Sequence, residues 1–181
     1  MNAIIVDTNI RIEGIRVTHT FQVYQAIDQN REFLSTWLPF VRQTRSQDDT
    51  EAFIRSVLAE QANRKEEVFV VWYNDYFAGL IGLKDTDHLN QKTEIGYWLI
   101  EKMTGKGIMT RCVKTLTDYA FSTMKMNRVQ IKCAIGNDKS SAIPKRLGFQ
   151  FEGIERAGEK HTDRFLDLEV YSLLKLEWDR K

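Results

Sequence analysis

The chain is poor in the residues that interrupt or cross-link a fold. Its only prolines among 181 residues are Pro39 and Pro144, and no glycine- or serine-rich stretch divides the sequence. We therefore expect residues 1–181 to form a single domain, since domains usually contain roughly 100 to 200 residues. The cysteines, Cys112 and Cys133, form no C-x-x-C pair and the three histidines are scattered, so the sequence predicts neither a disulfide framework nor a metal site.

The chain also lacks an excess of positive or negative charge, and it has no long hydrophobic run. Twenty-six basic and 25 acidic side chains give a formal net charge of +1, which creates no overall basic field for nucleic acid. No segment approaches the ~18 apolar residues of a membrane span, and the N-terminal residues do not read as a targeting segment. We expect a cytoplasmic protein that binds neither nucleic acid nor a membrane directly.

Hydrophobic periodicity divides the chain into strand and helix signals. The Asn74-Asp75 pair between two strand-like runs predicts a hairpin, and Ser46 followed by acidic residues predicts a helix start. The order of elements predicts a mixed α/β (α+β) fold with a central, mostly antiparallel sheet flanked by helices. Strands are expected at 10–17, 67–73, 76–83, 92–100, 128–135, 149–159 and 164–174, and helices within 18–38, after Ser46, from about Met109 to Met124 and at 140–147.

A glycine-rich loop, Thr104-Gly-Lys-Gly-Ile-Met-Thr110, joins a predicted strand to a predicted helix. Gly105 and Gly107 let the backbone approach a ligand, and the free N–H groups at the positive end of a helix attract an anion. The spacing differs from that of the P-loop and of the dinucleotide fingerprint. The loop therefore predicts a phosphate site of another kind, with a plain strand-to-helix turn as the alternative.

This strand, loop and helix resemble the pyrophosphate-binding segment of the Gcn5-related N-acetyltransferases. Further stretches occur in the order and spacing of the branch that modifies ribosomal-protein N-termini. The resemblance covers about residues 11 to 174. The stretches are NREFLSTWLP from Asn30, EIGYWL from Glu94, NDKS from Asn137 and KRLGF from Lys145.

The resemblance implies acetyl-CoA as co-substrate. The backbone of strand 98–100 would hold the pantetheine arm, the loop would hold the pyrophosphate, Asn137 would contact the arm and Lys145 a phosphate. Core packing for the strand, a helix cap for Asn137 and solvated surface for Lys145 are the alternatives. The family loop usually has a small residue where this chain has Met109. The implied cofactor-binding residues are Trp98, Leu99, Ile100, Gly105, Lys106, Gly107, Ile108, Met109, Thr110, Asn137 and Lys145.

Acetyl transfer to an amine needs a base for the amine proton and an acid for the leaving sulfur. The resemblance implies Glu159 as the base and Ser140 as the acid. Glu94, acting through water, is a second candidate base, and Tyr171 is a rival acid. A helix cap for Ser140, solvated surface for both glutamates and core packing for Tyr171 are the alternatives. The implied acceptor-binding residues are Asn30, Arg31, Leu34, Trp37, Leu38 and Tyr97.

The acceptor that the sequence favours is the N-terminal α-amine of a ribosomal or other protein. At pH 7, deprotonating an α-amine of pKa ~7.8 costs about 1 kcal/mol, whereas a lysine-like amine of pKa ~10.4 costs nearly 5 kcal/mol. A polyamine or aminoglycoside acceptor is the first alternative, and a CoA-binding module without transfer activity is the second. Apolar residues such as Trp37 and Phe40 fit either a substrate groove or a homodimer interface.

Overall fold

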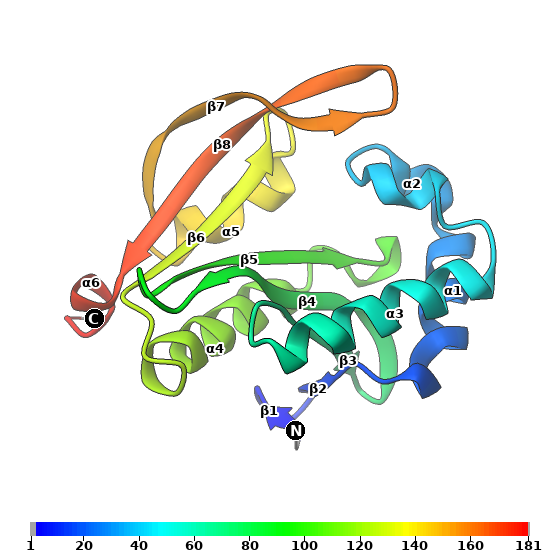
Figure 1. Ribbon diagram of the computed structural model, residues 1–181, viewed down its shortest axis with the longest axis horizontal. Helices are drawn as coiled ribbons and strands as arrows, with labels where there is room; N and C mark the ends of the chain where they lie inside the picture. Colours follow the sequence, from blue (N-terminus) through cyan, green and yellow to red (C-terminus); the bar gives the residue numbers. More distant parts are fainter. Residues whose placement is uncertain (1–2, 181) are drawn as a thin grey trace.

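The computed structural model describes residues 3–180, which form one eight-stranded sheet with helices on both sides (Figure 1). The strand order is β1-β2-β3-β4-β5-β6-β8-β7, and all neighbours run antiparallel except β5 and β6. The predicted mixed α/β class is confirmed. The elements are β1 (Ile4–Ile5), β2 (Ile10–Gly14), η1 (Val17–His19), α1 (Thr20–Gln29), α2 (Arg31–Ser35), η2 (Pro39–Arg42), α3 (Gln47–Ala62), β3 (Glu67–Tyr73), β4 (Tyr76–Asp87), β5 (Lys92–Leu99), η3 (Glu101–Met103), α4 (Ile108–Ser122), β6 (Arg128–Ala134), α5 (Asp138–Arg146), β7 (Gln150–His161), β8 (Arg164–Leu174) and α6 (Lys175–Trp178).

Local sequence signals explain where several elements begin and turn. Ser46 caps α3 by accepting a hydrogen bond from the Asp49 N–H, while the Asp49 side chain bonds back to the Ser46 N–H. Asn74 and Asp75 turn the β3–β4 hairpin with φ values of 49° and 64°. Asn137 caps α5, so this helix begins two residues earlier than the sequence predicts. No helix within residues 3–180 has the length and apolar character to cross a bilayer.

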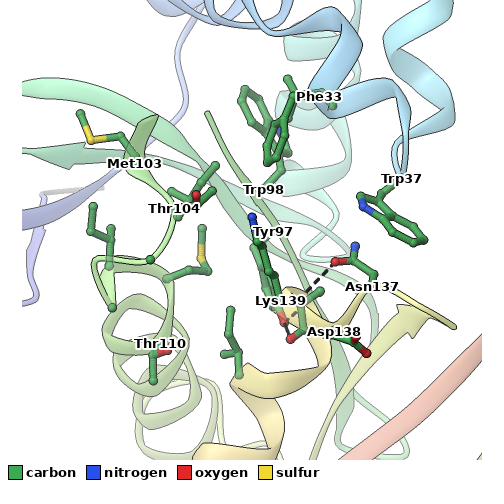
Figure 2. Close-up of a pocket in the computed structure, with 18 of the residues that line it drawn as sticks. Phe33, Trp37, Tyr97, Trp98, Met103, Thr104, Thr110, Asn137, Asp138 and Lys139 are labelled. Atoms are coloured by element: carbon green, nitrogen blue, oxygen red, sulfur yellow. Dashed lines mark hydrogen bonds between the residues drawn. The ribbon is translucent and has the colours of Figure 1, made fainter. Parts of the chain in front are cut away.

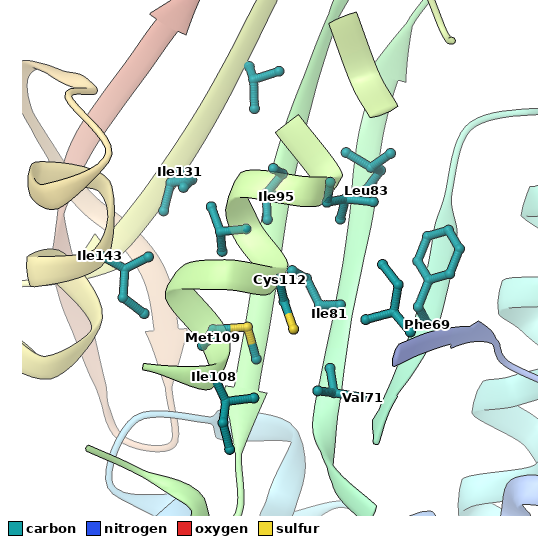
Figure 3. Packing of buried hydrophobic residues seen from close by; sticks show 14 of the residues in the cluster. Phe69, Val71, Ile81, Leu83, Ile95, Ile108, Met109, Cys112, Ile131 and Ile143 are labelled. Carbon is teal, nitrogen blue, oxygen red and sulfur yellow. The ribbon is translucent and has the colours of Figure 1, made fainter. Parts of the chain in front are cut away.

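The two faces of the sheet are covered by different helices. Residues of α4 pack against Ile81, Leu83 and Ile95 on one face (Figure 3), whereas α1 and α3 pack against Val68, Val70 and Leu80 on the other. Alternate residues of β3 and β4 serve the two cores, as strand geometry requires. Burial of each large aliphatic side chain stabilises the fold by roughly 1.5–3 kcal/mol. This packing fixes the start of α4, and with it the glycine loop.

β5 and β6 separate soon after they meet. Their pairing joins residues 92–94 to residues 128–130, whereas β5 continues to Leu99 beside β4. Figure 1 shows β6 and β8 diverging from β5. Beyond Glu94, the edge of β5 that faces β6 is therefore left without a strand partner in the described sheet.

Candidate functional site

A cavity of about 910 Å³ lies where β5 and β6 separate. This volume is within the range of small-molecule sites, ~300–1,000 Å³. Its walls come from β5, the glycine loop, the start of α4, α5 and the α2 region (Figure 2). The sequence-predicted site residues that line it are Leu34, Trp37, Leu38, Tyr97, Trp98, Leu99, Gly105, Gly107, Ile108, Met109, Thr110, Asn137 and Ser140.

The glycine loop has a defined left-handed conformation at the cavity wall. Gly105 and Gly107 have φ values of 74° and 70°, which side-chain-bearing residues rarely adopt. A Cβ at either position would meet nothing within 4 Å, so the backbone conformation, not crowding, favours glycine. Arg111 donates to the carbonyls of Lys106 and Gly107 at 3.2 and 3.3 Å and pairs with Asp7 at 2.6 Å. These contacts hold the loop beside the first-turn N–H groups of α4, which have no acceptors within the helix.

Ser140 lies in a small cluster of proton donors. Its Oγ donates to the Tyr97 hydroxyl at 3.3 Å and is 3.3 Å from the Cys133 Sγ, while Tyr97 donates to the Ser140 carbonyl at 3.0 Å. Asn137 accepts from the Ser140 N–H at 3.3 Å. Burial raises the pKa of Tyr97 well above its usual range and also raises that of Cys133. Near neutral pH both groups keep their protons, so the Ser140 hydroxyl is supported by neutral hydrogen-bonding partners.

A second cavity, of about 590 Å³, lies beneath α1, η2 and α3 on the other face of the sheet. Leu38, Tyr97 and Trp98 line both cavities. Glu159 reaches the second cavity from β7, and Glu66, just before β3, also lines it. The two cavities therefore share wall residues at the end of β5, with Ser140 lining one and Glu159 lining the other.

The half-buried Glu159 carboxylate binds a proton more readily than an exposed glutamate does, because its pKa is raised. Burial raises the pKa of Glu159, while Lys84 and His161 lower it and Glu94 raises it. No ion pair of Glu159 is found within residues 3–180. Lys84 and His161 compensate its negative charge without pairing with it directly, and a cationic group entering the cavity would stabilise it further.

Glu94 is held in an ionic network instead. Its side chain is only 6% exposed and contacts Lys84 Nζ at 2.9 Å, Gln130 Nε2 at 2.9 Å and Lys132 Nζ at 3.7 Å. Burial would lower the pKa of Lys84, but the neighbouring Glu94 carboxylate raises it on balance. Glu94 lines neither cavity. The structure therefore does not bring Glu94 together with Ser140.

Tyr171 and Lys145 contact each other outside the two cavities. The Tyr171 hydroxyl donates to Glu169 Oε2 at 2.8 Å, and Tyr171 is 1% exposed. Lys145 Nζ lies 5.6 Å from the centre of the Tyr171 ring and 3.9 Å from Glu169 Oε2. Burial and the hydrogen bond to Glu169 raise the pKa of Tyr171. Neither residue lines a cavity. In this structure Tyr171 is therefore not placed to act as the acid, and Lys145 is not placed to contact a phosphate, in either cavity.

Four further expected residues have structural contacts and do not line either cavity. Asn30 accepts from the Glu101 N–H at 3.2 Å, and Arg31 donates to the carbonyls of Val41 and Thr44 at 2.9 and 2.7 Å. These bonds connect the α2 region to η2 and to the end of β5. In addition, Ile100 is buried in the core, and Lys106 Nζ lies over the Tyr73 ring at 5.7 Å.

Sequence reasoning missed Arg146, which lines the first cavity and donates to Thr110 Oγ1 at 3.3 Å. The spacing of residues along α5 could have indicated that Arg146 faces the cavity. Lys139, Ile143 and Arg146 are four and three residues apart, so they share one face of α5, and all three line the cavity. Lys145 points elsewhere because adjacent helical residues differ by about 100° in direction.

Comparison with known proteins identifies related sequences over most of the chain. Residues 9–150 match the family described as Acetyltransferase (GNAT) domain. The putative ribosomal N-acetyltransferase YdaF of Bacillus subtilis (strain 168) is 36% identical over 175 residues, covering 96% of each chain. The ribosomal-protein-serine acetyltransferase of Escherichia coli (strain K12) is 26% identical, covering 92% of this chain and 93% of the relative.

A solved structure with a bound donor shares the fold. Microcin C7 self immunity acetyltransferase MccE, in complex with acetyl-CoA and AMP, superposes with a TM-score of 0.88 at 28% identity. The alignment covers 93% of this chain and 94% of that one.

Proposed function

The chain belongs to the GNAT family of acetyltransferases, and we propose that it transfers the acetyl group of acetyl-CoA to the N-terminal α-amine of a protein in the cytoplasm. Relatives over almost the full length are named for ribosomal N-acetylation. We further propose that residues 1–181 act as one acetyltransferase domain. The observation that carries the proposal is that Tyr97 and Trp98 line both cavities, one with the glycine loop and Ser140 and the other with Glu159.

The first cavity has the features that acetyl-CoA requires. The loop at Gly105 and Gly107 and the N-terminus of α4 provide N–H groups and a positive helix end for the pyrophosphate. The open edge of β5 at Trp98 and Leu99 suits the amide-bearing pantetheine arm, because a strand edge offers unpaired backbone groups. Acetyl-CoA would supply an activated acetyl thioester, and in our proposal the Ser140 hydroxyl, which lines this cavity, protonates the leaving sulfur.

The second cavity supplies a base for the acceptor amine. In our proposal Glu159 removes the amine proton, directly or through one water, on one side of β5, while Ser140 serves the sulfur on the other. Tyr97 and Trp98 line both cavities, and in our proposal the acceptor amine and the acetyl thioester meet beside them. This arrangement uses proximity and proton transfer, which is what acyl transfer to an amine needs.

Replacing Gly107 with valine tests the proposed pyrophosphate site. Valine is disfavoured at a φ of 70°, because a left-handed residue with a Cβ is strained by roughly 1–2 kcal/mol. The loop should therefore shift, and the affinity for acetyl-CoA measured by calorimetry should fall by about tenfold or more. Gly153→Val is the matched control, since Gly153 has a φ of 143° but lies in β7 outside both cavities. Unchanged affinity in a folded Gly107→Val protein would remove the assignment of the loop.

The acceptor class can be tested by turnover against two panels. We expect thiol release from acetyl-CoA with peptides that carry a free N-terminal amine, and no release when the same peptides are N-terminally blocked. Peptides with an internal lysine and a blocked N-terminus control for side-chain acetylation. Turnover of polyamines but not of free N-terminal peptides would contradict the proposed acceptor.

A polyamine is the second candidate acceptor, and the charge of the second cavity favours it. Glu66 and Glu159 line this cavity together with Asp49 and one cation, Lys84, which pairs with Glu94. Burial raises the pKa of Glu66 and Glu159, although Lys84 partly opposes this. Two poorly solvated carboxylates match an acceptor that carries more than one ammonium group. Glu66→Gln separates the candidates: it should raise the KM of a polyamine several-fold and leave that of a neutral N-terminal peptide within about twofold.

A further inference from the structure

Arg146 is a cation at the mouth of the first cavity whose charge the fold does not use. It is exposed, and within residues 3–180 no carboxylate pairs with it. Its neighbours differ in this respect. Arg111 pairs with Asp7 and holds the loop carbonyls, whereas Lys145 is turned toward Glu169. Among these cations, Arg146 is the one that both lines the cavity and remains available to an anion.

Its position is fixed between two helices. Arg146 lies at the end of α5, and its Nη1 donates at 3.3 Å to the hydroxyl of Thr110, which is in the first turn of α4. This bond uses one of the five N–H groups of the guanidinium. Lys139, on the same face of α5, makes no hydrogen bond or ion pair within the described residues, so it adds positive charge without a fixed direction.

We propose that Arg146 binds the 3′-phosphate of coenzyme A and thereby selects the phosphorylated donor over its 3′-dephospho form. This inference rests on the proposed function, because it requires coenzyme A in the first cavity. The donor carries two kinds of phosphate. The pyrophosphate is served by the backbone N–H groups of the loop and of α4, which carry no net charge.

The remaining phosphate needs a different partner. A ribose phosphate is a terminal monoester with a charge of about −2 and three acceptor oxygens, like a phosphorylated side chain. A guanidinium binds such a group through two parallel hydrogen bonds with matching geometry. Arg146 lines the same cavity as the loop and contacts Thr110 in the first turn of α4, so its guanidinium is next to the helix start that would hold the pyrophosphate.

The test compares the affinities of coenzyme A and 3′-dephospho-coenzyme A by calorimetry. We expect the wild-type protein to bind coenzyme A about tenfold more tightly, as charge-assisted hydrogen bonds allow. Arg146→Gln should abolish that preference by weakening coenzyme A alone, and Arg146→Lys should retain part of it. Lys114→Gln, which removes an exposed cation of α4 outside the cavity, controls for overall charge.

Each other outcome has a defined meaning. Equal weakening of both ligands by Arg146→Gln would make it a pyrophosphate contact and overturn the proposal. Loss of the preference in Lys145→Gln, with Arg146→Gln unaffected, would assign the phosphate to Lys145 instead. A wild-type protein that binds both ligands equally would also overturn the proposal while leaving the proposed acetyltransferase function intact. Only failure to bind either ligand would count against that function.

Discussion

Replacing Glu159 with glutamine should lower kcat/KM near pH 7 by about 10²-fold or more, the usual size of a general-base contribution. Glutamine keeps the size and much of the hydrogen bonding of the side chain but cannot accept the amine proton. Glu159 lines the acceptor-side cavity and has no ion pair within the described residues, so the loss of its charge breaks no salt bridge there. The measurement is kcat/KM with an N-terminal peptide at saturating acetyl-CoA.

The pH dependence distinguishes a base from a merely structural residue. Glu159 acts as a base only when ionised, so wild-type activity should be lost as pH falls through its pKa. Burial raises that pKa, so the loss should begin at a higher pH than for an exposed glutamate. In Glu159→Gln this acidic limb should disappear. Activity should instead recover as the free amine forms unaided, near pH ~8 for an α-amine but nearer ~10 for a polyamine.

Glu94→Gln is the matched comparison, because it makes the same chemical change in the ionic network. The Glu94 carboxylate pairs with Lys84 and Lys132 and is 6% exposed. Lys84 is 50% exposed and Lys132 also pairs with Glu155 at 2.7 Å, so the cost of removing this carboxylate should lie below the ~3–5 kcal/mol of breaking a fully buried ion pair. We therefore expect Glu94→Gln mainly to lower the free energy of unfolding. Its effect on kcat/KM should be much smaller than that of Glu159→Gln. A large kcat/KM defect in Glu94→Gln with none in Glu159→Gln would move the base to β5.

The fold was readable from the sequence because its signals are local. Periodicity, the Ser46 cap and the Asn74–Asp75 turn identified the helices, the hairpin and the mostly antiparallel sheet. The predicted and observed strand bounds differ where pairing with neighbouring strands overrides the local hydrophobic pattern. The strand expected first, at 10–17, is β2 and ends at Gly14, and the short β1 before it was not predicted. β4 continues through the polar residues 84–87, because β2 and β4 follow their neighbours in the sheet.

The site was less predictable than the fold. It depends on where side chains point and on which distant elements pack together, and residue spacing alone does not determine either. The glycine loop follows β5 and Ser140 follows β6; these two strands are parallel neighbours, and both groups line the first cavity. The second cavity instead combines residues from α1, α3, β4 and β7, which only the complete sheet brings together. In the same way, the pairing of Lys145 with Glu169 depends on the distance between α5 and β8, which no sequence period reports.

Replacing Ser140 with alanine should reduce kcat by about 10²-fold while changing the KM for acetyl-CoA much less. A hydroxyl that donates to sulfur as negative charge develops stabilises the transition state more than bound donor. The bond that caps α5 joins the Ser140 N–H to Asn137 and survives in alanine. The substitution also removes the Oγ contacts with Tyr97 and Cys133, so the free energy of unfolding is measured alongside kcat.

Tyr171→Phe is the rival test for the acid. The Tyr171 hydroxyl donates to Glu169 and lines neither cavity, so its removal should leave kcat within about twofold while slightly lowering stability. Tyr97→Phe adds a graded control, since it removes the hydroxyl behind Ser140 but not Ser140 itself. If Ser140→Ala keeps its kcat and Tyr171→Phe abolishes turnover, the protein must rearrange during catalysis so that Tyr171 reaches the sulfur, and Ser140 is then only a helix residue of α5.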